Sequence, residues 1–462
     1  MHSLPRRHQP GSRLQPLRCA IALALLATIP TGAHASTVTE WNALASSAPV
    51  APFFGGPPQQ ARVTAMVQIA VHDALNSIDR RYQTYDILPG AAPDSNPDAA
   101  VAAAAHRVLH GLIDPKPASP AKTAALAAVD TAYGAALAAI PDGNGEAHGI
   151  DAGIAAADAI IANRANDGSA TPNLPYAAPV AVGVYQPTPV MNTNPQAYIV
   201  PANEGWGRML PFVMRSPSQF RFDAGDLFDI NGDAYTRNYN EVKARGDALV
   251  RGTAPDSAES DIARFWPGGG ANWNRVLREI LAAPANNPQL DLALDLWQQA
   301  RLFALANLAE SDAAIAVFDT KYVYTFWRPV TAIRWQDDGN PATAPDAGWW
   351  SFMATPPYPD YVCGLTNASG AHAEILRRFF GTDDIAWGFT FNAPLVPLPA
   401  PLQPLPAKPI TRTFVSLHEA TDEAVDARVY GGMHFREGCV KGVTQGAQVG
   451  RFVFQHALRP LR

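Results

Sequence analysis

Apolar residues recur at steps of three and four along most of the chain, and this spacing predicts an all-α protein. The clearest example lies between residues 62 and 80, where Val63, Met66 and Val67 begin one apolar face. The same periodicity predicts further helices at residues 99–112, 120–139, 146–166, 239–251, 257–265, 273–283, 290–318, 366–380, 417–426 and 440–458. The helix at 290–318 is apolar around much of its circumference, so we expect it to be central. Alternating strand patterns are scarce.

Two segments lack this periodicity and divide the chain. Residues 168–217 are rich in Pro, Asn and Thr, which indicates an ordered connector along the surface. Residues 394–409 contain seven prolines, which favour a stiff, extended excursion over a helix. We predict a signal peptide at 1–35, an N-terminal helical region and connector at 36–215, and a C-terminal helical region at 216–462. The two helical regions are expected to pack as one compact unit.

The first residues have the composition of an export signal. Four arginines precede an apolar run at residues 19–29, and Ala33-His34-Ala35 follows as a small-x-small cleavage site. The run is too short to span a bilayer comfortably. We therefore predict cleavage after Ala35 and a periplasmic or secreted protein, with an uncleaved anchor as the alternative.

The charge of the mature chain narrows the choice of partners. Cleavage would change the formal charge from −6 to −10, because it leaves 31 Lys and Arg against 41 Asp and Glu. An acidic chain argues against nucleic acid or an anionic membrane as the partner. After the leader, no segment is apolar and long enough to span a membrane. The mature chain would keep two cysteines, Cys363 and Cys439.

Two short motifs in the C-terminal region combine cations with an imidazole. Lys321 and Arg328 enclose six residues and precede Pro329, and Arg428 and His434 enclose five. A spacing of seven is about two helical turns, so Lys321 and Arg328 can share one face of a helix that ends at Pro329. Three fixed cations suit a multiply charged oxyanion, and an imidazole among them can attack phosphorus or ligate a metal oxyanion. Taken singly, each motif also fits a solvated charged face.

The amino-acid sequence around these motifs resembles that of one protein family. The segments KYVYTFWRPVTAI at 321–333, TPPYPDY at 355–361 and RVYGGMHF at 428–435 resemble the vanadium-dependent haloperoxidase and type 2 phosphatidic acid phosphatase superfamily, especially its exported bacterial haloperoxidase-like branch. The resemblance implies packed four-helix bundles. It also implies a pocket that holds vanadate or phosphate between a lysine, two arginines, a serine hydroxyl, a glycine amide and a histidine.

The resemblance also implies roles for individual residues. Carried over by position, Lys321, Arg328 and Arg428 form a cationic cage, and Gly364 donates its backbone amide. His434 would ligate vanadate in a peroxidase, or act as the phosphorylated nucleophile in a phosphatase.

The central motif departs from the family pattern. After Tyr361 the family has a small residue and then Ser-Gly-His, whereas residues 362–365 read VCGL. Cys363 therefore stands for the serine, although a thiol is a poor hydrogen-bond donor. Leu365 stands for the acid–base histidine, and losing such a group costs about 10²–10⁴ in rate. A shifted Ser-Gly-Ala-His ends at His372, which on a continuous helix lies roughly 10 Å too far along to substitute.

Two further hypotheses follow from the family geometry. Cys363 and Cys439 would lie close together, and we hypothesise a disulfide bond between them, with two separate buried thiols as the alternative. Asp312, about three turns before Lys321, is a candidate partner for a cage arginine, or an ordinary acid on the helix surface.

The other histidines are weaker candidates for residues of the anion pocket. His418 fits a solvated or capping role better than a place at the pocket entrance. The His72-Asp73 pair is a weak candidate for the pocket.

The motifs and the resemblance are compatible with three functions. The first is a vanadate-dependent peroxidase that oxidises halide with hydrogen peroxide. The second is an acid phosphatase with His434 as nucleophile and the cage stabilising the transition state. The third is a non-catalytic oxyanion-binding homologue that kept the cage and lost the acid–base group at Leu365. A homodimer is a further expectation.

Overall fold

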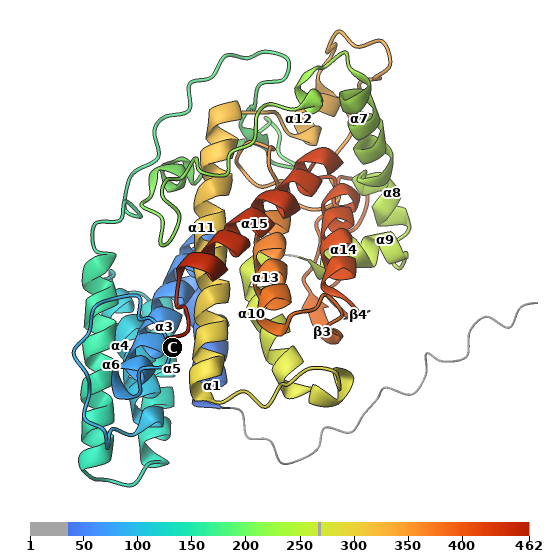
Figure 1. The fold of residues 1–462 in the computed structure, drawn as a ribbon. Coiled ribbons are helices and arrows are strands. Elements are labelled where there is room, and N and C mark those ends of the chain that lie inside the picture. The colour runs from blue at the N-terminus through green and yellow to red at the C-terminus, as the bar shows by residue number, and fades with distance from the viewer. Residues whose placement is uncertain (1–35, 267–268, 462) are drawn as a thin grey trace, which may run out of the picture. The chain divides into compact units, whose positions relative to one another are not determined.

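Long helices make up most of the described chain, as the hydrophobic periodicity predicts (Figure 1). The structure is a computed structural model that describes residues 36–461 except 267 and 268. For residues 269–272 it describes the backbone only. The predicted signal peptide at residues 1–35 lies outside the described residues. The predicted all-α class is confirmed.

The helices and strands of the described residues have the following bounds. The first part of the chain contains α1 Thr37–Ala45, α2 Val50–Phe53, α3 Pro57–Ile78, α4 Pro97–Ile113, α5 Pro120–Ala138, α6 Asn144–Asn163, β1 Thr188–Pro189, β2 Tyr198–Ile199 and η1 Glu204–Arg208. The second part contains η2 Asp226–Phe228, α7 Asp233–Arg245, α8 Ala248–Thr253, α9 Ala258–Phe265, α10 Gly269–Ala282, η3 Pro284–Asn286, α11 Leu296–Tyr324, α12 Pro329–Arg334, α13 Gly364–Phe380, β3 Trp387–Ala393, β4 Lys408–Phe414, α14 Leu417–Tyr430 and α15 Arg436–His456.

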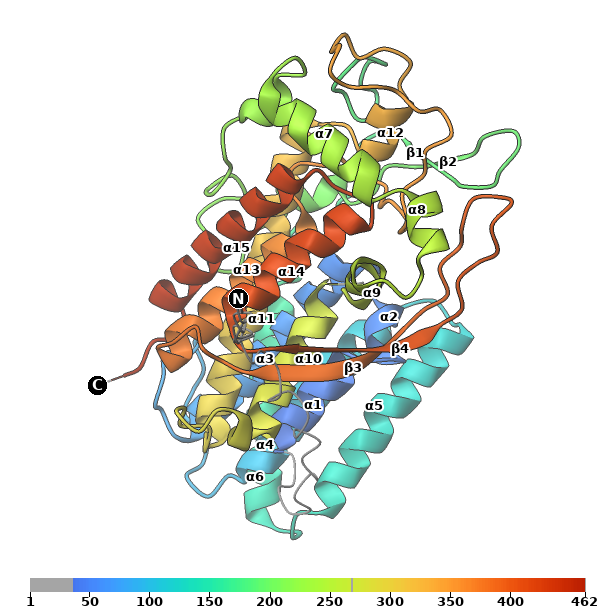
Figure 2. The same ribbon diagram turned by 90° about the vertical axis from the view of Figure 1, so that its right-hand side faces the viewer.

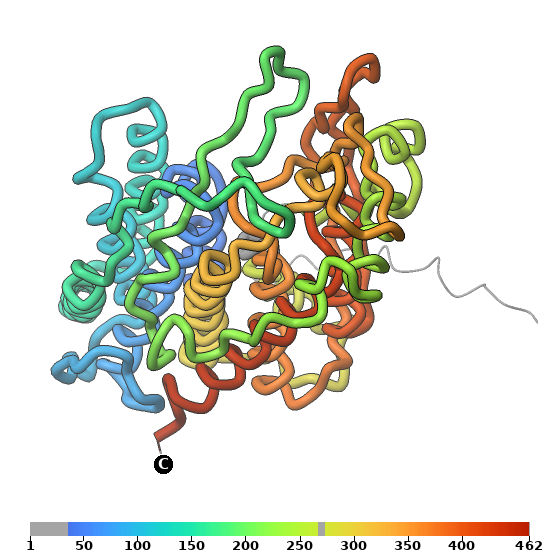
Figure 3. Tube along the Cα trace, turned by 90° about the horizontal axis from the view of Figure 1, so that it is seen from above, coloured from blue at the N-terminus to red at the C-terminus, as the bar shows by residue number. Residues whose placement is uncertain are grey.

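The longest helix, α11, lies between two groups of helices (Figures 1 and 3). A capping box fixes its start: the Asp295 side chain accepts from the Gln298 backbone N–H, and the Gln298 side chain accepts from the Asp295 N–H, each at 2.9 Å. Every residue from 300 to 313 is buried. The helix packs against α3 on one side and against α13 and α15 on the other. It is therefore central, as predicted.

The first group consists of α3, α4 and α6, with α5 packed against α4. Small residues let α4 and α6 approach closely. A Cβ on Gly153 of α6 would lie 2.7 Å from the Ala104 backbone nitrogen on α4. This group contacts α11 through α3. It contributes no residue to the site described below.

The second group is built around the contact between α13 and α15. Three glycines on α15 recur at every fourth position and face α13: Gly442, Gly446 and Gly450. A Cβ on Gly446 would overlap the carbonyl oxygen of Asn367, and one on Gly450 would lie 2.7 Å from that of Ala371. The two backbones are therefore in contact along their length. This contact brings the first turns of α13 and α15 together.

A β-hairpin beside α10 was not predicted from the sequence (Figure 2). Strands β3 and β4 pair antiparallel, with Trp387 opposite Phe414 and their ring centroids 4.4 Å apart. The proline-rich segment is the long connection between these strands, narrowed by a bridge between Val396 and Leu405. The extended segment predicted at residues 394–409 is thus the loop of this hairpin.

Contacts group the described residues into one compact unit. The predicted division at residue 215 stays a prediction. Among the residues described, no helix is long and apolar enough to cross a bilayer.

Candidate functional site

Lys321 and Arg328 do not lie on one helix, which corrects the prediction. Helix α11 ends at Tyr324, and Thr325 takes a left-handed conformation with φ of 48°. Arg328 is the N-cap residue of α12, and Pro329 is the first residue of that helix. Proline suits this first position because its missing N–H would have no helical partner there. Pro329 therefore begins a helix instead of ending one.

The Lys321 side chain is fully buried and holds the loop that precedes α13. Its Nζ donates to the carbonyl oxygens of Pro359 and Asp360, each at 2.8 Å. Burial lowers the pKa of Lys321 well below its usual value, and the positive charge of Arg328 lowers it further. Lys321 therefore gains from any anion that enters the cage, since an anion favours its charged form.

Arg328 is buried and is held by backbone carbonyls. Its Nε donates to Tyr358 O at 2.7 Å, and its Nη1 donates to Met433 O at 2.9 Å. The same Nη1 lies 2.8 Å from Nε2 of His434. Nη2 has no partner among the described residues. One donor of a rigid guanidinium is therefore left for a further acceptor.

His434 lies between this arginine and a carboxylate. Its Nδ1 is 2.9 Å from Oδ1 of Asp360, and both side chains are buried. The lone pair of Nε2 is the acceptor available to Arg328 Nη1. The contact to Asp360 is an ion-pair distance, but neither Asp360 oxygen has a well-directed hydrogen bond within the described structure.

Asp360 was missed by the sequence analysis. It stands in the TPPYPDY segment, so the residue itself was in view. Its position beside His434 depends on the packing of two segments more than 70 residues apart, which no local pattern reveals.

Arg428 closes the cage from the last turn of α14, with 8% of its surface exposed. Its Nε has no partner among the described residues. Gly431 and Gly432 follow in the chain. Gly432 has a left-handed φ of 72°, which favours glycine, and a Cβ there would also collide with the carbonyl oxygen of Gly246. The same Gly246 ends α7, so the helix predicted at 239–251 is in fact two helices. This close approach turns the chain inward just before His434.

The altered central motif forms the start of α13. Cys363 is the N-cap residue, and its backbone N–H donates to Gly438 O at 2.9 Å. A Cβ on Gly364 would meet nothing within 4 Å, so there is open space beside this residue. Leu365, in the place of the acid–base histidine, is 8% exposed. Leucine at this position supplies no group that moves a proton.

The two cysteines meet here, but the predicted disulfide bond is not formed. Both are free and fully buried, and their sulfurs lie within 4.8 Å of each other and of a ring nitrogen of His434. Burial alone would raise the pKa of the Cys363 thiol, but its hydrogen bond with Cys439 and the neighbouring His434 and Arg428 lower it well below the ordinary value. Burial and Cys363 raise the pKa of Cys439. The sequence predicted the proximity correctly and the covalent bond wrongly.

Asp312 does not partner a cage arginine, which corrects a second prediction. Its carboxylate accepts from the backbone N–H groups of Phe212, Val213 and Met214, at 2.6, 2.8 and 2.7 Å. Nine residues separate it from Lys321, and about 100° per residue places the two on opposite faces of the helix. Asp312 instead fixes the connector to α11.

None of the other histidines considered has a contact with the cage. His372 is buried, with Nε2 3.0 Å from Glu310 and its ring stacked on Trp273. His72 contacts Asp73 at 2.9 Å within α3. The His418 side chain is 75% exposed at the start of α14 and pairs with Asp422. The shifted motif therefore supplies no acid–base group.

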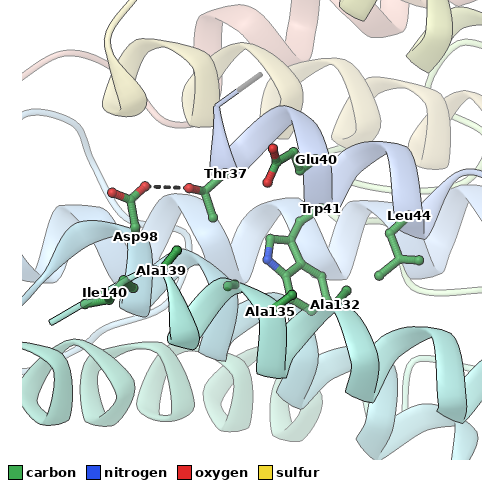
Figure 4. A pocket seen from close by; sticks show the side chains of 10 residues that line it. Thr37, Glu40, Trp41, Leu44, Asp98, Ala132, Ala135, Ala139 and Ile140 are labelled. Atoms are coloured by element: carbon green, nitrogen blue, oxygen red, sulfur yellow. Dashed lines mark hydrogen bonds between the residues drawn. The ribbon is translucent and has the colours of Figure 1, made fainter. Parts of the chain in front are cut away.

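A separate cavity of about 390 Å³ lies between α1, α4 and α5 (Figure 4). Trp41 forms part of its wall, and the Thr37 hydroxyl donates to Asp98 at 2.5 Å at one end. It shares no lining residue with the cage. Glu40 and Asp98 are its two carboxylates, of which Asp98 accepts from Thr37, and we assign the cavity no role.

The cage contains more basic than acidic groups among the described residues. Lys321, Arg328 and Arg428 are its basic side chains, and Asp360 is its carboxylate, 3.7 Å from Arg328 and 2.9 Å from His434. The two arginines each keep a buried donor without an acceptor, although such donors are normally paired. The cage is therefore incomplete as a set of hydrogen bonds until an acceptor is present.

Comparison with known proteins identifies first the class and then particular relatives. Residues 301–462, which contain the whole cage, match the family of the VCPO second helical-bundle domain. The chain is 25% identical over 467 aligned residues to the vanadium chloroperoxidase of Curvularia inaequalis, covering 82% of this chain and 74% of that protein. These findings, with the folds below, confirm the superfamily predicted from the sequence.

Solved structures share the fold across nearly the whole chain. A bacterial vanadium-dependent iodoperoxidase has a TM-score of 0.68 at 22% identity, covering 92% of this chain and 97% of that one. The holo form of a bacterial vanadium-dependent chloroperoxidase has a TM-score of 0.67 at 18% identity, covering 89% and 94%. The all-α architecture is thus that of vanadium haloperoxidases.

Proposed function

We propose that this chain binds a tetrahedral oxyanion, vanadate or its analogue phosphate, in the cage formed by Lys321, Arg328, Arg428 and His434. The observation that carries the proposal is the pair of buried arginine donors without acceptors, Nη2 of Arg328 and Nε of Arg428. Leaving such donors unpaired costs about 1–3 kcal/mol each. An oxyanion between the two guanidinium groups would remove that cost.

The residues present fit most of what such an anion requires. The two arginines and Lys321 supply charge, Gly364 supplies the backbone N–H of the first residue of α13, and His434 supplies a nitrogen ligand. Asp360 would hold Nδ1 of His434 and so direct Nε2 toward the anion. Arg328 would have to release Nε2, which it contacts in this structure.

The serine and acid–base histidine of the family pattern are the parts that do not fit. Bound vanadate supplies a centre that activates hydrogen peroxide for halide oxidation. At this site Leu365 can neither take up nor return a proton, and Cys363 is a weak donor. We therefore propose a haloperoxidase homologue with strong anion binding and weak halide oxidation. The exported location predicted from residues 1–35 is part of this proposal.

The relatives support a peroxidase over a phosphatase, because those named above are chloroperoxidases and an iodoperoxidase. A phosphatase would use the same cage and would need the same missing proton donor for its leaving group. We rank it second.

Calorimetric titration with orthovanadate, and separately with phosphate, tests the proposal. We expect one anion per chain, competition between the two anions, and binding weakened about 10- to 100-fold by Arg428→Gln, the equivalent of 1.5–3 kcal/mol for a charged hydrogen bond. The matched control is Arg451→Gln, whose side chain is 57% exposed on α15 and should leave the affinity unchanged. Absence of binding, or equal effects of the two substitutions, would contradict the proposal.

A further inference from the structure

Cys363, Cys439 and His434 form a compact cluster that the oxyanion cage alone does not explain. Their ligand atoms, two sulfurs and a ring nitrogen, all lie within 4.8 Å of one another, and all three side chains are buried. They come from three places: the N-cap of α13, the first turn of α15, and the loop between α14 and α15. Two of the three are the residues that depart from, or lie beyond, the family pattern quoted above.

This set of atoms suits a thiophilic cation better than a hard one. In a tetrahedral zinc site with bonds of about 2.3 Å to sulfur and 2.0 Å to nitrogen, the ligand atoms lie about 3.5–3.8 Å apart. Since the atoms lie within 4.8 Å of one another, the cluster would need to contract by at most about 1.0–1.3 Å. Calcium and magnesium prefer oxygen ligands, whereas thiolate and imidazole select zinc and related ions.

The backbone already holds the two cysteines at this separation. Cys363 N–H donates to Gly438 O at 2.9 Å, and the Thr366 hydroxyl donates to Cys439 O at 2.8 Å. The glycine contact between α13 and α15 fixes the two helix starts relative to each other. A metal would thus find two of its ligands positioned in advance.

Asp360 lies beside such a site. One of its oxygens is 2.9 Å from Nδ1 of His434, within the distance at which carboxylates orient metal-ligating imidazoles. Both of its oxygens are buried without a directed hydrogen bond from the described residues. Three protein ligands leave the fourth position of a tetrahedral ion free for water or another small ligand. Three protein ligands and one open position are the arrangement of a reactive zinc site rather than a closed structural one.

The cation site and the cage share His434. Arg328 Nη1 lies 2.8 Å from Nε2 of His434 and would have to release that nitrogen for a cation, as it would for the oxyanion. The oxyanion would use the same His434, so the two ligands exclude each other.

We infer that Cys363, Cys439 and His434 bind a thiophilic divalent cation of the zinc class, in competition with the oxyanion. This inference goes beyond the proposed function, because it assigns a cation to residues that the oxyanion needs only in part. It can fail while vanadate still binds, and it can hold if vanadate does not.

Cobalt(II) titration of the reduced, metal-free mature protein tests the inference. We expect one ion per chain with thiolate-to-cobalt charge-transfer absorption, displaced by zinc and suppressed by excess vanadate. Cys363→Ser and Cys439→Ser should each weaken or abolish that absorption, whereas the surface substitution His418→Gln should leave it unchanged. Asp360→Asn should weaken cobalt binding about tenfold.

A measurement on the unaltered protein covers the case in which a cysteine variant fails to fold. Cadmium-113 NMR of the wild type should give one resonance in the range of sulfur-coordinated cadmium. No bound cobalt or cadmium with both thiols shown to be reduced, or a cadmium resonance in the oxygen-coordinated range, would overturn the inference. So would charge-transfer absorption that survives both cysteine substitutions. Vanadate titration of the same samples reports separately on the oxyanion.

Discussion

The packing of α15 on α13 gives the sharpest prediction about how the site is built. Gly446 is buried, and a Cβ there would overlap the Asn367 carbonyl oxygen and lie 2.9 Å from the Ala371 nitrogen. Both neighbours are backbone atoms of α13, so no side chain can rotate away. Alanine gains about 1 kcal/mol over glycine in helix propensity, while overpacking costs about 1–3 kcal/mol, and here the upper end applies. We expect Gly446→Ala to destabilise the protein by about 2 kcal/mol.

Gly134 provides the matched control for this prediction. It lies in α5, is exposed, and would place a Cβ in open space with nothing within 4 Å. Gly134→Ala should therefore stabilise the protein by about 0.5–1 kcal/mol. Urea unfolding followed by circular dichroism measures both changes. If Gly446→Ala were as stable as the wild type, the close contact between α13 and α15 would be wrong. Any loss of anion affinity in that variant would show how far the helix contact positions the cage.

Two further predictions concern charge and proton transfer. Leu365→His should raise vanadate-dependent bromide oxidation at least tenfold over wild type, because it restores a positioned acid–base group, whereas Leu365→Ala should not; equal rates in both variants would show that the missing histidine does not limit turnover. Burial raises the pKa of Asp312 from 3.8 to about 6 despite three backbone hydrogen bonds. The protonated form is therefore favoured in the folded state, so the stability that Asp312 contributes is present below about pH 4 and is lost as the pH rises through 6, by about 3 kcal/mol. Unfolding of wild type and Asp312→Asn between pH 4 and 6.5 checks this: their difference in unfolding free energy should change by about that amount, and a constant difference would contradict it.

Much of the fold could be predicted because helical periodicity is a local property. The start of α13 and the end of α6 were placed within a few residues, and α11 was correctly expected at the centre. The hairpin was missed although Trp387, Phe389 and Phe391 alternate with smaller or polar residues. The prolines that follow predict an extended segment by themselves, and they gave no sign that the residues on either side pair as strands.

The site could be predicted as a set of residues but only partly as a geometry. Pro329 was read as a helix end, yet proline is equally suited to the first position of a helix. The position of Asp312 followed from helical geometry and was misjudged. Asp360 and the spacing of the two cysteine sulfurs depend on how α13, α15 and the loop before α13 pack, and no spacing in the sequence encodes that.

The most direct test of the central claim is a crystal structure of the mature protein soaked in orthovanadate, with anomalous data collected above and below the vanadium edge. The account predicts one vanadium peak between the guanidinium groups of Arg328 and Arg428, within reach of His434. Vanadium bound elsewhere, or an empty cage at a concentration that saturates binding in solution, would contradict it.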